Sequence, residues 1–279
     1  MFEYPSGVAV VTGGANGIGR ALAVEAARRG ASVMIGDVVD ASETIAEIEG
    51  LGGRASWQIC DVASLSDVES LREATTSLYG DINLVCSNVS VGVSGPLHTT
   101  SADDFERILR VNVVGSYNVL ATFAEVLIRT SARGLIAHFL FTGSENSLGV
   151  PPIQAPPYVG QVSAYTLSKQ AIFAMAAVAR RDLAESGVRV AIVCPGWTWN
   201  ERLKQIALVN ERMSQIFDAY AQEPAEVARR AFDGLANGVH IIPTNPVSCD
   251  FVIETHREII RAMQSIQFDN NLPHTTDSE

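Results

Sequence analysis

Residues 8–19 read VAVVTGGANGIG, and this stretch decides the fold. The apolar run at its start predicts a buried strand, and the alanine-rich sequence that follows predicts a helix. Gly13, Gly17 and Gly19 let the backbone turn tightly and approach a pyrophosphate, which would rest on the free amides of the helix start. Glycines also serve purely as turn formers. The strand before this turn and the helix after it favour a nucleotide site.

The rest of the chain repeats this alternation of apolar runs and amphipathic stretches. Nearly continuous hydrophobic strands between helices are typical of a parallel sheet covered on both faces, so the pattern predicts one Rossmann-like, doubly wound α/β domain of about seven strands. The expected strands are 8–12, 32–37, 55–61, 82–88, 134–143, 188–196 and 239–243. The expected helices are 17–29, 41–50, 64–79, 101–130, 163–186, 224–237 and 249–266. We assign this domain to 1–266 and a polar, frayed tail to 267–279.

Two segments interrupt the alternation. Residues 149–162 contain four prolines, which predict a rigid loop before the next helix. Residues 197–223 carry an apolar helical patch and predict a lid over the substrate. Both segments follow the carboxyl ends of strands, the side on which open α/β sheets bind ligands.

The composition is that of an ordinary soluble globular protein, with 279 residues, 47% hydrophobic content and a net charge of -11. This acidity argues against a general nucleic-acid or anionic-membrane surface. The chain shows no stretch of about 18 uncharged apolar residues and no basic region before its first apolar run, so we expect a cytoplasmic protein. The four cysteines are interpreted as core thiols, and the five histidines lack paired metal spacing, so we expect no metal site.

Acidic residues follow the second and third expected strands. Asp37 can accept hydrogen bonds from both ribose hydroxyls of an adenosine and would repel a 2′-phosphate, which favours NAD. The alternative is an ordinary strand-end aspartate that caps a turn. Asp61, followed by Val62, could meet the adenine amino group, and a helix N-cap is the alternative for it.

Further short motifs occur in a fixed order along the chain. They are Asp61-Val62, Asn88 in CSNVS, Asn112 in RVNVVGSYNV, Ser144 in FLFTGSENS, Tyr165 and Lys169 in YTLSK, and Pro195-Gly196 in VCPGWTWN. With these motifs and the TGGANGIG turn, the chain resembles the short-chain dehydrogenase/reductase family over roughly residues 6–245. The resemblance implies an NAD-dependent enzyme that acts on CH–OH groups. It also implies a homotetramer, for which 101–130 and 163–186 offer apolar helix faces.

The resemblance implies a catalytic set of Asn112, Ser144, Tyr165 and Lys169. Tyr165 would act as the general acid/base that removes the alcohol proton while hydride moves to the nicotinamide. A free phenol has a pKa near 10, and both the Lys169 ammonium one helical turn away and the charged nicotinamide would lower it. Ser144 would hydrogen-bond the substrate oxygen, Lys169 would also hold the nicotinamide ribose, and in the family the position of Asn112 holds a water that links the lysine to solvent.

The cofactor contacts expected from these motifs extend along the whole resemblance. They are Gly13, Asn16, Gly17, Ile18, Gly19, Asp37, Asp61, Val62, Asn88, Tyr165, Lys169, Pro195, Gly196 and Thr198. The family's NNAG pattern reads SNVS at 87–90, and only Asn88 is carried over. After Pro195-Gly196, either Thr198 or Asn200 can meet the nicotinamide carboxamide, and the sequence leaves that choice open.

The expected function is hydride transfer between NAD and a largely apolar secondary alcohol or ketone, aromatic and alicyclic ones included. Trp197, Trp199 and Tyr158 favour such a flat or bulky substrate. One alternative is an NADPH-dependent carbonyl or acyl-thioester reductase, against which Asp37 followed by Val38 speaks. Another is a non-catalytic dinucleotide-binding regulator, against which the complete catalytic set speaks. Fold alone would decide between none of these.

Overall fold

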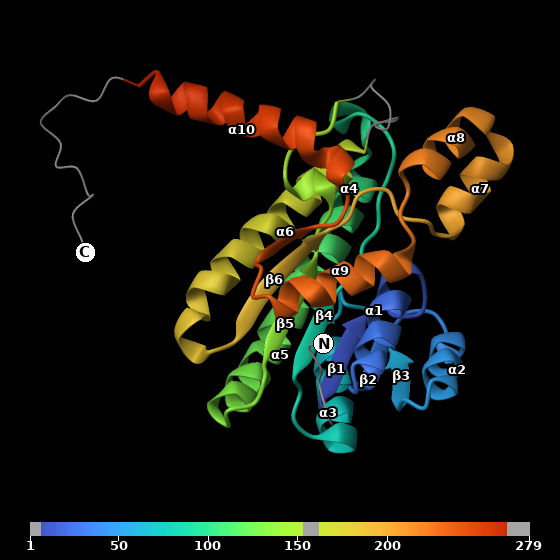
Figure 1. Cartoon of the computed structure of the whole chain (residues 1–279), viewed down its shortest axis with the longest axis vertical. Coiled ribbons are helices and arrows are strands. Elements are labelled where there is room, and N and C mark those ends of the chain that lie inside the picture. Colours follow the sequence, from blue (N-terminus) through green and yellow to red (C-terminus); the bar gives the residue numbers. More distant parts are fainter. Residues whose placement is uncertain (1–6, 153–161, 267–279) are drawn as a thin grey trace, which may run out of the picture.

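A seven-stranded parallel sheet forms the centre of the protein in this computed structural model, which describes residues 7–152 and 162–266 (Figure 1). The strand order is β3-β2-β1-β4-β5-β6-β7. The strands are β1 (Val8–Thr12), β2 (Ser32–Asp37), β3 (Ala55–Ile59), β4 (Leu84–Ser87), β5 (His138–Thr142), β6 (Arg189–Cys194) and β7 (Ile241–Pro243). The order reverses between β1 and β4, and ligands of such sheets bind outside the carboxyl ends of the strands at this switch point.

Helices cover both faces of the sheet (Figure 1). They are α1 (Gly17–Arg28), α2 (Ser42–Gly50), α3 (Leu65–Tyr79), α4 (Ala102–Ile108), α5 (Gly115–Ala132), α6 (Ser163–Asp182), α7 (Glu201–Val209), α8 (Glu211–Tyr220), α9 (Pro224–Ala236) and α10 (Cys249–Gln264). The predicted fold class is confirmed, and each expected strand is present with its ends moved by a few residues.

The two apolar cores follow from the alternation of side chains along each strand. In β1, Ala9 and Val11 pack with residues of α1, α2 and α9 on one face. Val8 and Val10 of the same strand pack with α3, α5 and α6 on the other. Both faces are therefore buried, which explains why the strands read as continuous hydrophobic runs.

The helix expected at 101–130 is one continuous helical stretch with a π-helical segment, η2 (Leu109–Val114), between α4 and α5. Residues Ala102–Ala132 are long and apolar enough to cross a membrane by length and composition alone. Half of the most apolar window in that stretch is buried, and α5 contacts α3, β4 and β5. This stretch is thus a core helix of the α/β domain.

The expected lid at 197–223 contains the helices α7 and α8, which stand together at one side of the sheet's carboxyl edge (Figure 1). The residues 153–161 of the proline-rich segment and the tail 267–279 lie outside the described residues. Of the four cysteines expected in the core, Cys60, Cys86 and Cys194 are buried, but Cys249 is exposed. The interpretation of Cys249 was wrong because this residue opens the exposed helix α10 rather than closing a strand.

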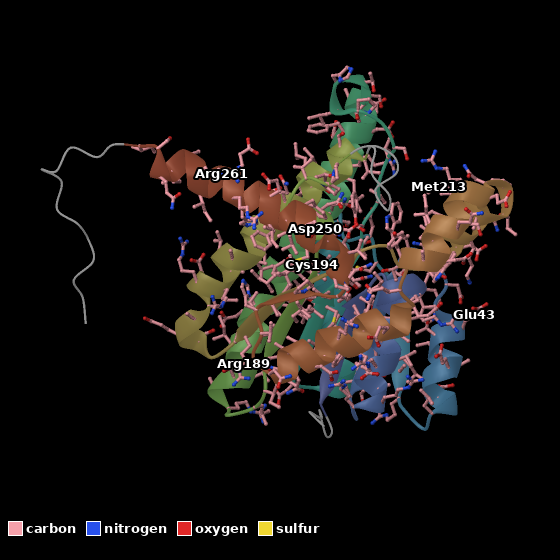
Figure 2. The ribbon with its side chains drawn as sticks, turned by 45° about the horizontal axis from the view of Figure 1, so that its top comes forward. Glu43, Arg189, Cys194, Met213, Asp250 and Arg261 are labelled. Carbon is pink, nitrogen blue, oxygen red and sulfur yellow. The ribbon has the colours of Figure 1, made fainter. Side chains whose placement is uncertain are left out.

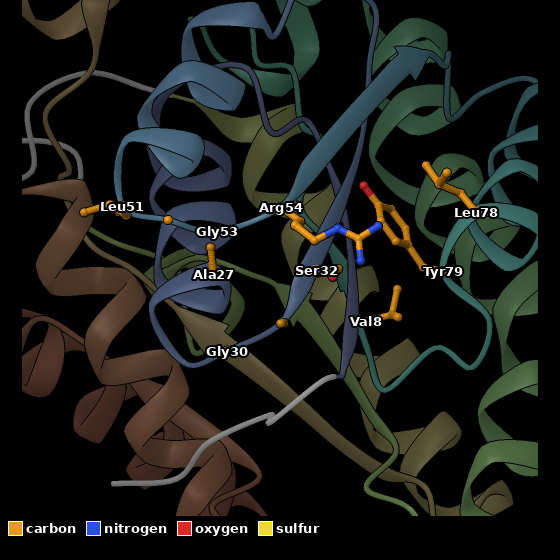
Figure 3. A pocket seen from close by; sticks show the side chains of 11 residues that line it. Val8, Ala27, Gly30, Ser32, Leu51, Gly53, Arg54, Leu78 and Tyr79 are labelled. Carbon is orange, nitrogen blue, oxygen red and sulfur yellow. The ribbon is translucent and has the colours of Figure 1, made fainter.

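A cavity of about 430 Å³ lies at the amino ends of β1 and β2, opposite the carboxyl edge (Figure 3). Val8, Gly30, Ser32 and Leu78 contribute to its lining. The guanidinium carbon of Arg54 lies 5.5 Å from the centroid of the Tyr79 ring at this cavity. None of the expected site residues is among the lining residues that the structure describes.

Candidate active site

The glycine-rich turn after β1 requires glycine at two positions for different reasons. Gly13 has a φ of 69°, which side chains other than glycine rarely adopt. A Cβ placed on Gly19 would lie 1.8 Å from the main-chain oxygen of Gly13, so any side chain would force the turn apart. The turn is therefore so tight that no side chain separates its backbone from the switch point of the sheet.

Helix α1 begins at Gly17, directly after this turn. Among the described residues, no side chain caps its amino end, and no acidic residue occupies its first turn. The Asn88 side chain braces the turn from the next strand, because its Nδ2 donates to the Gly13 oxygen over 3.2 Å. The Asn88 amide also donates to Thr12 Oγ1 at 3.1 Å. The helix start thus offers free N–H groups to an anion on a rigid support.

Asp37 ends β2 beside the same turn and is 8% exposed. Its Oδ2 accepts from the Ala15 amide at 2.9 Å, and its Oδ1 accepts from the Val39 amide at 3.2 Å. Each carboxylate oxygen can accept a further hydrogen bond. The carboxylate therefore lies against the glycine turn, and the exposed Val38 follows it.

Asp61 and Val62 follow β3. Asp61 is exposed and accepts from the Ala63 amide at 2.9 Å, whereas Ser64 is the residue that caps α3. The alternative interpretation of Asp61 as the helix N-cap is thus wrong, because the chain makes one more turn before the helix begins. Val62 is buried against Gly115, where a Cβ would lie 2.6 Å from Val62 Cγ2.

Helix α6 brings Tyr165 and Lys169 to one face, and the turn after β5 brings Ser144 to the same place. The Lys169 Nζ lies 5.5 Å from the centroid of the Tyr165 ring and donates to the Thr142 oxygen at 2.8 Å. The side chains of Ser144 and Ser90 lie close enough to the Tyr165 hydroxyl for each of them to lower its pKa. The structure thus joins three of the four expected catalytic residues.

Burial dominates the electrostatics of this group. The pKa of Tyr165 is raised to about 12, mainly by burial and also by the charge of Glu145, while interactions with the side chains of Ser144 and Ser90 oppose the rise. Burial lowers the pKa of Lys169 to about 8. We expected Lys169 to lower the pKa of Tyr165, but in the protein alone the loss of solvent outweighs that attraction.

Asn112, the fourth expected residue, is fully buried in the π-helical segment η2. Its amide exchanges two hydrogen bonds with the main chain of Val91, at 2.7 and 2.9 Å. The same amide donates to Ser168 Oγ at 2.9 Å, next to Lys169 on α6. Asn112 therefore connects α6 with the segment that carries Ser90, and π-helical turns are frequent at such functional sites.

Three residues after Ser144 were missed by the sequence interpretation. They form the 3-10 turn η3 (Glu145–Ser147) and are all buried. Asn146 Nδ2 donates to Thr166 Oγ1 at 2.8 Å, and Ser147 Oγ donates to the Lys169 oxygen at 2.8 Å. Polar letters directly after a buried strand, SENS at 144–147, were the available signal.

The segment after β6 forms the base of the lid. Thr198 is 7% exposed, and its hydroxyl donates to the Gly196 oxygen at 3.0 Å. Asn200 is the N-cap of α7, where its Oδ1 accepts from the Leu203 amide at 2.9 Å. A bridge between Thr198 and Gln222 closes the two ends of the lid on each other.

The site has a shape that fits a dinucleotide. The Gly13–Gly19 contact leaves no room for a side chain, the helix start above it is uncapped, and the Asp37 carboxylate borders the same turn. Among the described residues, no three His, Cys, Asp or Glu side chains are grouped as metal ligands. The fold and this turn define a doubly wound α/β protein with a dinucleotide cradle at its switch point.

Comparison with known families gives the narrower assignment. The family described as short chain dehydrogenase matches residues 7–208, which is more than half of the chain. This protein therefore belongs to the short chain dehydrogenase family, as the motifs predicted.

Individual relatives share about a third of their aligned residues with this chain. The chain is 34% identical over 192 residues to 1-deoxy-11-beta-hydroxypentalenate dehydrogenase of Streptomyces exfoliatus, covering 67% of this chain and 66% of that protein. It is 33% identical over 188 residues to "Probable oxidoreductase EphD" of Mycobacterium tuberculosis, covering 67% of this chain and 30% of that protein. The chain thus spans less than a third of the length of EphD.

Two solved structures share the fold. A short-chain dehydrogenase/reductase from Burkholderia phymatum in complex with NAD has a TM-score of 0.81 at 23% identity, covering 98% of this chain and 100% of that chain. The NADP active-site complex of RhlG from Pseudomonas aeruginosa has a TM-score of 0.78 at 20% identity, covering 88% of this chain and 96% of that chain. The fold therefore occurs with either dinucleotide.

Proposed function

We propose that this protein is an oxidoreductase that interconverts secondary alcohols and ketones with NAD, and that Tyr165 is its general acid/base. The observation that carries the proposal is the meeting of Ser144, Tyr165 and Lys169 at the carboxyl edge of the sheet, beside the dinucleotide cradle. The residues come from two elements that are 21 residues apart in sequence, since Ser144 follows β5 and Tyr165 lies on α6. A structural role alone would not require a phenol, a hydroxyl and a buried ammonium in contact.

The chain's own residues can hold the cofactor along the carboxyl edge. When bound, the nicotinamide dinucleotide supplies or takes up the hydride of the reaction. The glycine turn and the start of α1 would hold the pyrophosphate, Asp37 the adenosine ribose, and Asp61 and Val62 the adenine. Asn88, Tyr165, Lys169, Pro195, Gly196 and Thr198 would hold the nicotinamide half. The use of Asn200 as the cap of α7 favours Thr198 for the carboxamide contact.

Tyr165 handles the proton. In the reducing direction its hydroxyl donates a proton to the ketone oxygen, which Ser144 holds by a hydrogen bond. A pKa of about 12 keeps the phenol protonated at neutral pH, the form that serves as an acid. In the oxidising direction the phenolate is needed, so we expect oxidation to rise toward alkaline pH and reduction to fall.

The Lys169 side chain changes its charge close to neutral pH. With a pKa of about 8, the buried ammonium gives up its proton more easily than a surface lysine does. Asn112 fixes the adjoining turn of α6 through Ser168 and so keeps Lys169 in register with Tyr165. These contacts keep the Lys169 ammonium beside the proposed acid/base.

The dinucleotide preference is proposed to be NAD. The Asp37 carboxylate is nearly buried against the glycine turn, where a 2′-phosphate would meet a like charge with little solvent to screen it. The exposed Val38 provides no positive charge to offset that repulsion.

The proposed substrate is largely apolar. The lid has a small apolar core of its own, in which the rings of Trp197 and Trp199 lie 5.3 and 5.9 Å from the ring of Phe217. Both tryptophans remain partly exposed at the base of the lid. Apolar surface of this kind favours a flat or bulky apolar molecule, and we propose that 197–223 closes over it.

The proposal is tested by Tyr165→Phe, with NAD and a panel of aromatic and alicyclic secondary alcohols. Loss of the hydroxyl should lower kcat at least about 100-fold while NAD binding, measured by calorimetry, stays nearly unchanged. Tyr79→Phe is the matched control, because this phenol lies away from the proposed site, where its hydroxyl donates to Ser56 Oγ at 2.9 Å. A Tyr165→Phe enzyme that keeps most of its activity would disprove the role of Tyr165.

We also propose a homotetramer that pairs through α5 and α6. The exposed apolar side chains Val114, Tyr117, Leu167 and Val178 on or beside these helices support it. Light scattering at micromolar concentration should give about four times the mass of one chain, and the mass of a single chain would contradict the proposal.

A further inference from the structure

A buried carboxyl group lies directly beside the proposed catalytic residues and has no part in the reaction described so far. Glu145 follows Ser144 in the turn η3 and is 6% exposed. Carboxylates are almost never buried to this extent unless a partner holds them. The partner here is Ser248, whose hydroxyl donates to Glu145 Oε2.

The surroundings of Glu145 are built to receive it. Its amide donates to the Pro195 oxygen at 2.8 Å, which joins η3 to the segment after β6. A Cβ on Gly196 would lie 2.8 Å from Glu145 Oε2, so only glycine at that position leaves space for the carboxyl. The carboxyl group thus fills a gap that the Pro195-Gly196 turn leaves open.

Ser248 links the same carboxyl to the lid. It ends the turn η5 (Pro246–Ser248) immediately before α10. Two residues of the segment leading into this turn are bound to the end of the lid. Thr244 Oγ1 donates to Gln222 Oε1 at 2.7 Å, and Asn245 Nδ2 donates to the Tyr220 oxygen at 2.9 Å. Glu145 therefore lies where three segments meet. They are the turn that carries Ser144, the Pro195-Gly196 turn and the base of the lid.

The titratable groups nearest to the catalytic turn come from two further elements. Tyr165 and Lys169 lie on α6, and Cys194 ends β6 near the centre of the molecule in Figure 2. The charge of Glu145 acts on Tyr165 in the direction that opposes the phenolate. Asp250, at the start of α10 in Figure 2, is exposed to solvent.

We propose that Glu145 is a positioning residue that ties Ser248 and the lid base to the catalytic turn, and that its ionisation sets the pH range in which Tyr165 accepts a proton. This inference rests on the proposed role of Tyr165. When Glu145 is protonated, Tyr165 loses its proton more readily, and when Glu145 is ionised, the phenol is held. A neutral side chain at 145 should therefore extend alcohol oxidation to lower pH.

Glu145 and Tyr165 ionise in different pH ranges. Burial raises its pKa to about 7 from the ordinary 4.5, and the Ser248 hydrogen bond opposes that rise. A group whose pKa is higher in the folded state stabilises the fold fully below pH 4.5, and this contribution is lost as the pH rises through 7. The melting temperature of the wild type should fall over this window relative to a variant without the carboxyl.

The test uses Glu145→Gln, which keeps an acceptor for Ser248 but cannot ionise. The profile of kcat/KM against pH is measured for oxidation of the best alcohol from the panel, for example 1-phenylethanol, with saturating NAD. The alkaline rise should move by about 0.5 to 1 pH unit toward lower pH. Ser248→Ala should move it the same way by less, because Glu145 then stays protonated to higher pH.

Asp250→Asn is the matched control, since it removes an exposed carboxylate from the same region. A profile for Glu145→Gln that superimposes on the wild type, or a shift equally large in Asp250→Asn, would overturn the inference. If Glu145→Gln does not fold, the Ser248→Ala profile alone tests the inference. An unshifted profile of Ser248→Ala would then overturn it.

Failure of the proposed function is separable from failure of this inference. An active Tyr165→Phe enzyme would reject Tyr165 as the acid/base and the inference with it. An inactive Tyr165→Phe enzyme with an unmoved Glu145→Gln profile would reject only Glu145. The melting temperature measured from pH 4 to 8 gives a readout without substrate. Parallel curves for the wild type and Glu145→Gln would show that Glu145 does not titrate in this window, and would also reject the inference.

Discussion

The two ends of the carboxyl edge of the sheet are built differently. At the dinucleotide end, the glycine turn, α1 and β2 belong to a large apolar core shared with α9, and Arg29 ties α1 to Asp233 of α9 over 2.9 Å. At the proposed substrate end, α7 and α8 pack mainly on their own small cluster around Phe217 (Figure 1). The first region is part of the body of the protein, whereas the second is attached to it through a narrow base.

The difference follows from what each region must do. A pyrophosphate cradle needs a fixed backbone, because free amides bind an anion only if they are held in place. A substrate cover must open and close, so its stability is drawn from few contacts outside itself. The shared part of the function is thus built into the rigid core, and the part proposed to select a substrate is built into the attached segment 197–223.

The largest expected effect on cofactor binding is at the rigid end, in Gly19→Ala. Its Cβ would lie 1.8 Å from the Gly13 oxygen, so the turn must open. We expect NAD affinity to fall at least about 100-fold by calorimetry, about 2.7 kcal/mol. Gly52→Ala is the control, because no atom lies within 4 Å of its Cβ and only its φ of 79° opposes the change. Equal losses in the two variants would mean that the close approach is not what matters.

The second prediction compares two buried phenylalanines. Phe232 lies in the main core and Phe217 in the lid core, and both are 0% exposed. Phe232→Ala should lower the free energy of unfolding by about 3–5 kcal/mol. Phe217→Ala should change it much less, but should raise KM for the alcohol and speed hydrogen exchange in 197–223, because it loosens only the lid. Equal losses of global stability would show that the lid folds as part of the main core.

The smallest effect concerns cofactor choice. Asp37→Ala should weaken NAD binding by about 1.5–3 kcal/mol, the scale of a hydrogen bond to a charged group, and should relieve repulsion of NADP. Adding Val38→Arg should then favour NADP, because a guanidinium pairs with phosphate in two places and position 38 is exposed. The ratio of kcat/KM for the two cofactors measures this. Asp40→Asn, an exposed neighbour, is the control, and a wild type that uses NADP equally well would contradict the prediction.

The pattern of the sequence was sufficient for the sheet and for much of the site. The alternation of apolar strands with helices, and the glycines at the turns between them, depend on local geometry. The positions of β1, its turn and α1 could therefore be predicted to within a residue. Tyr165 and Lys169 share a face because their spacing of four residues is a helical turn. The division of the helix at 101–130 by η2 was not predictable. A π-helical turn is stabilised by tertiary contacts rather than by the helix propensity of its own residues.

The sequence by itself determined the fold class, the family and the residue types at the proposed site, because those depend on periodicity and on short motifs within single elements. Only the tertiary structure decided what surrounds them. It placed Ser90 against Tyr165, Asn112 between Val91 and Ser168, and Glu145 against Ser248, which lies 103 residues further along the chain. Burial by distant segments also raises the pKa of Tyr165, against the effect expected of Lys169. Desolvation is a sum over all neighbours in space, and no local stretch of sequence contains that sum.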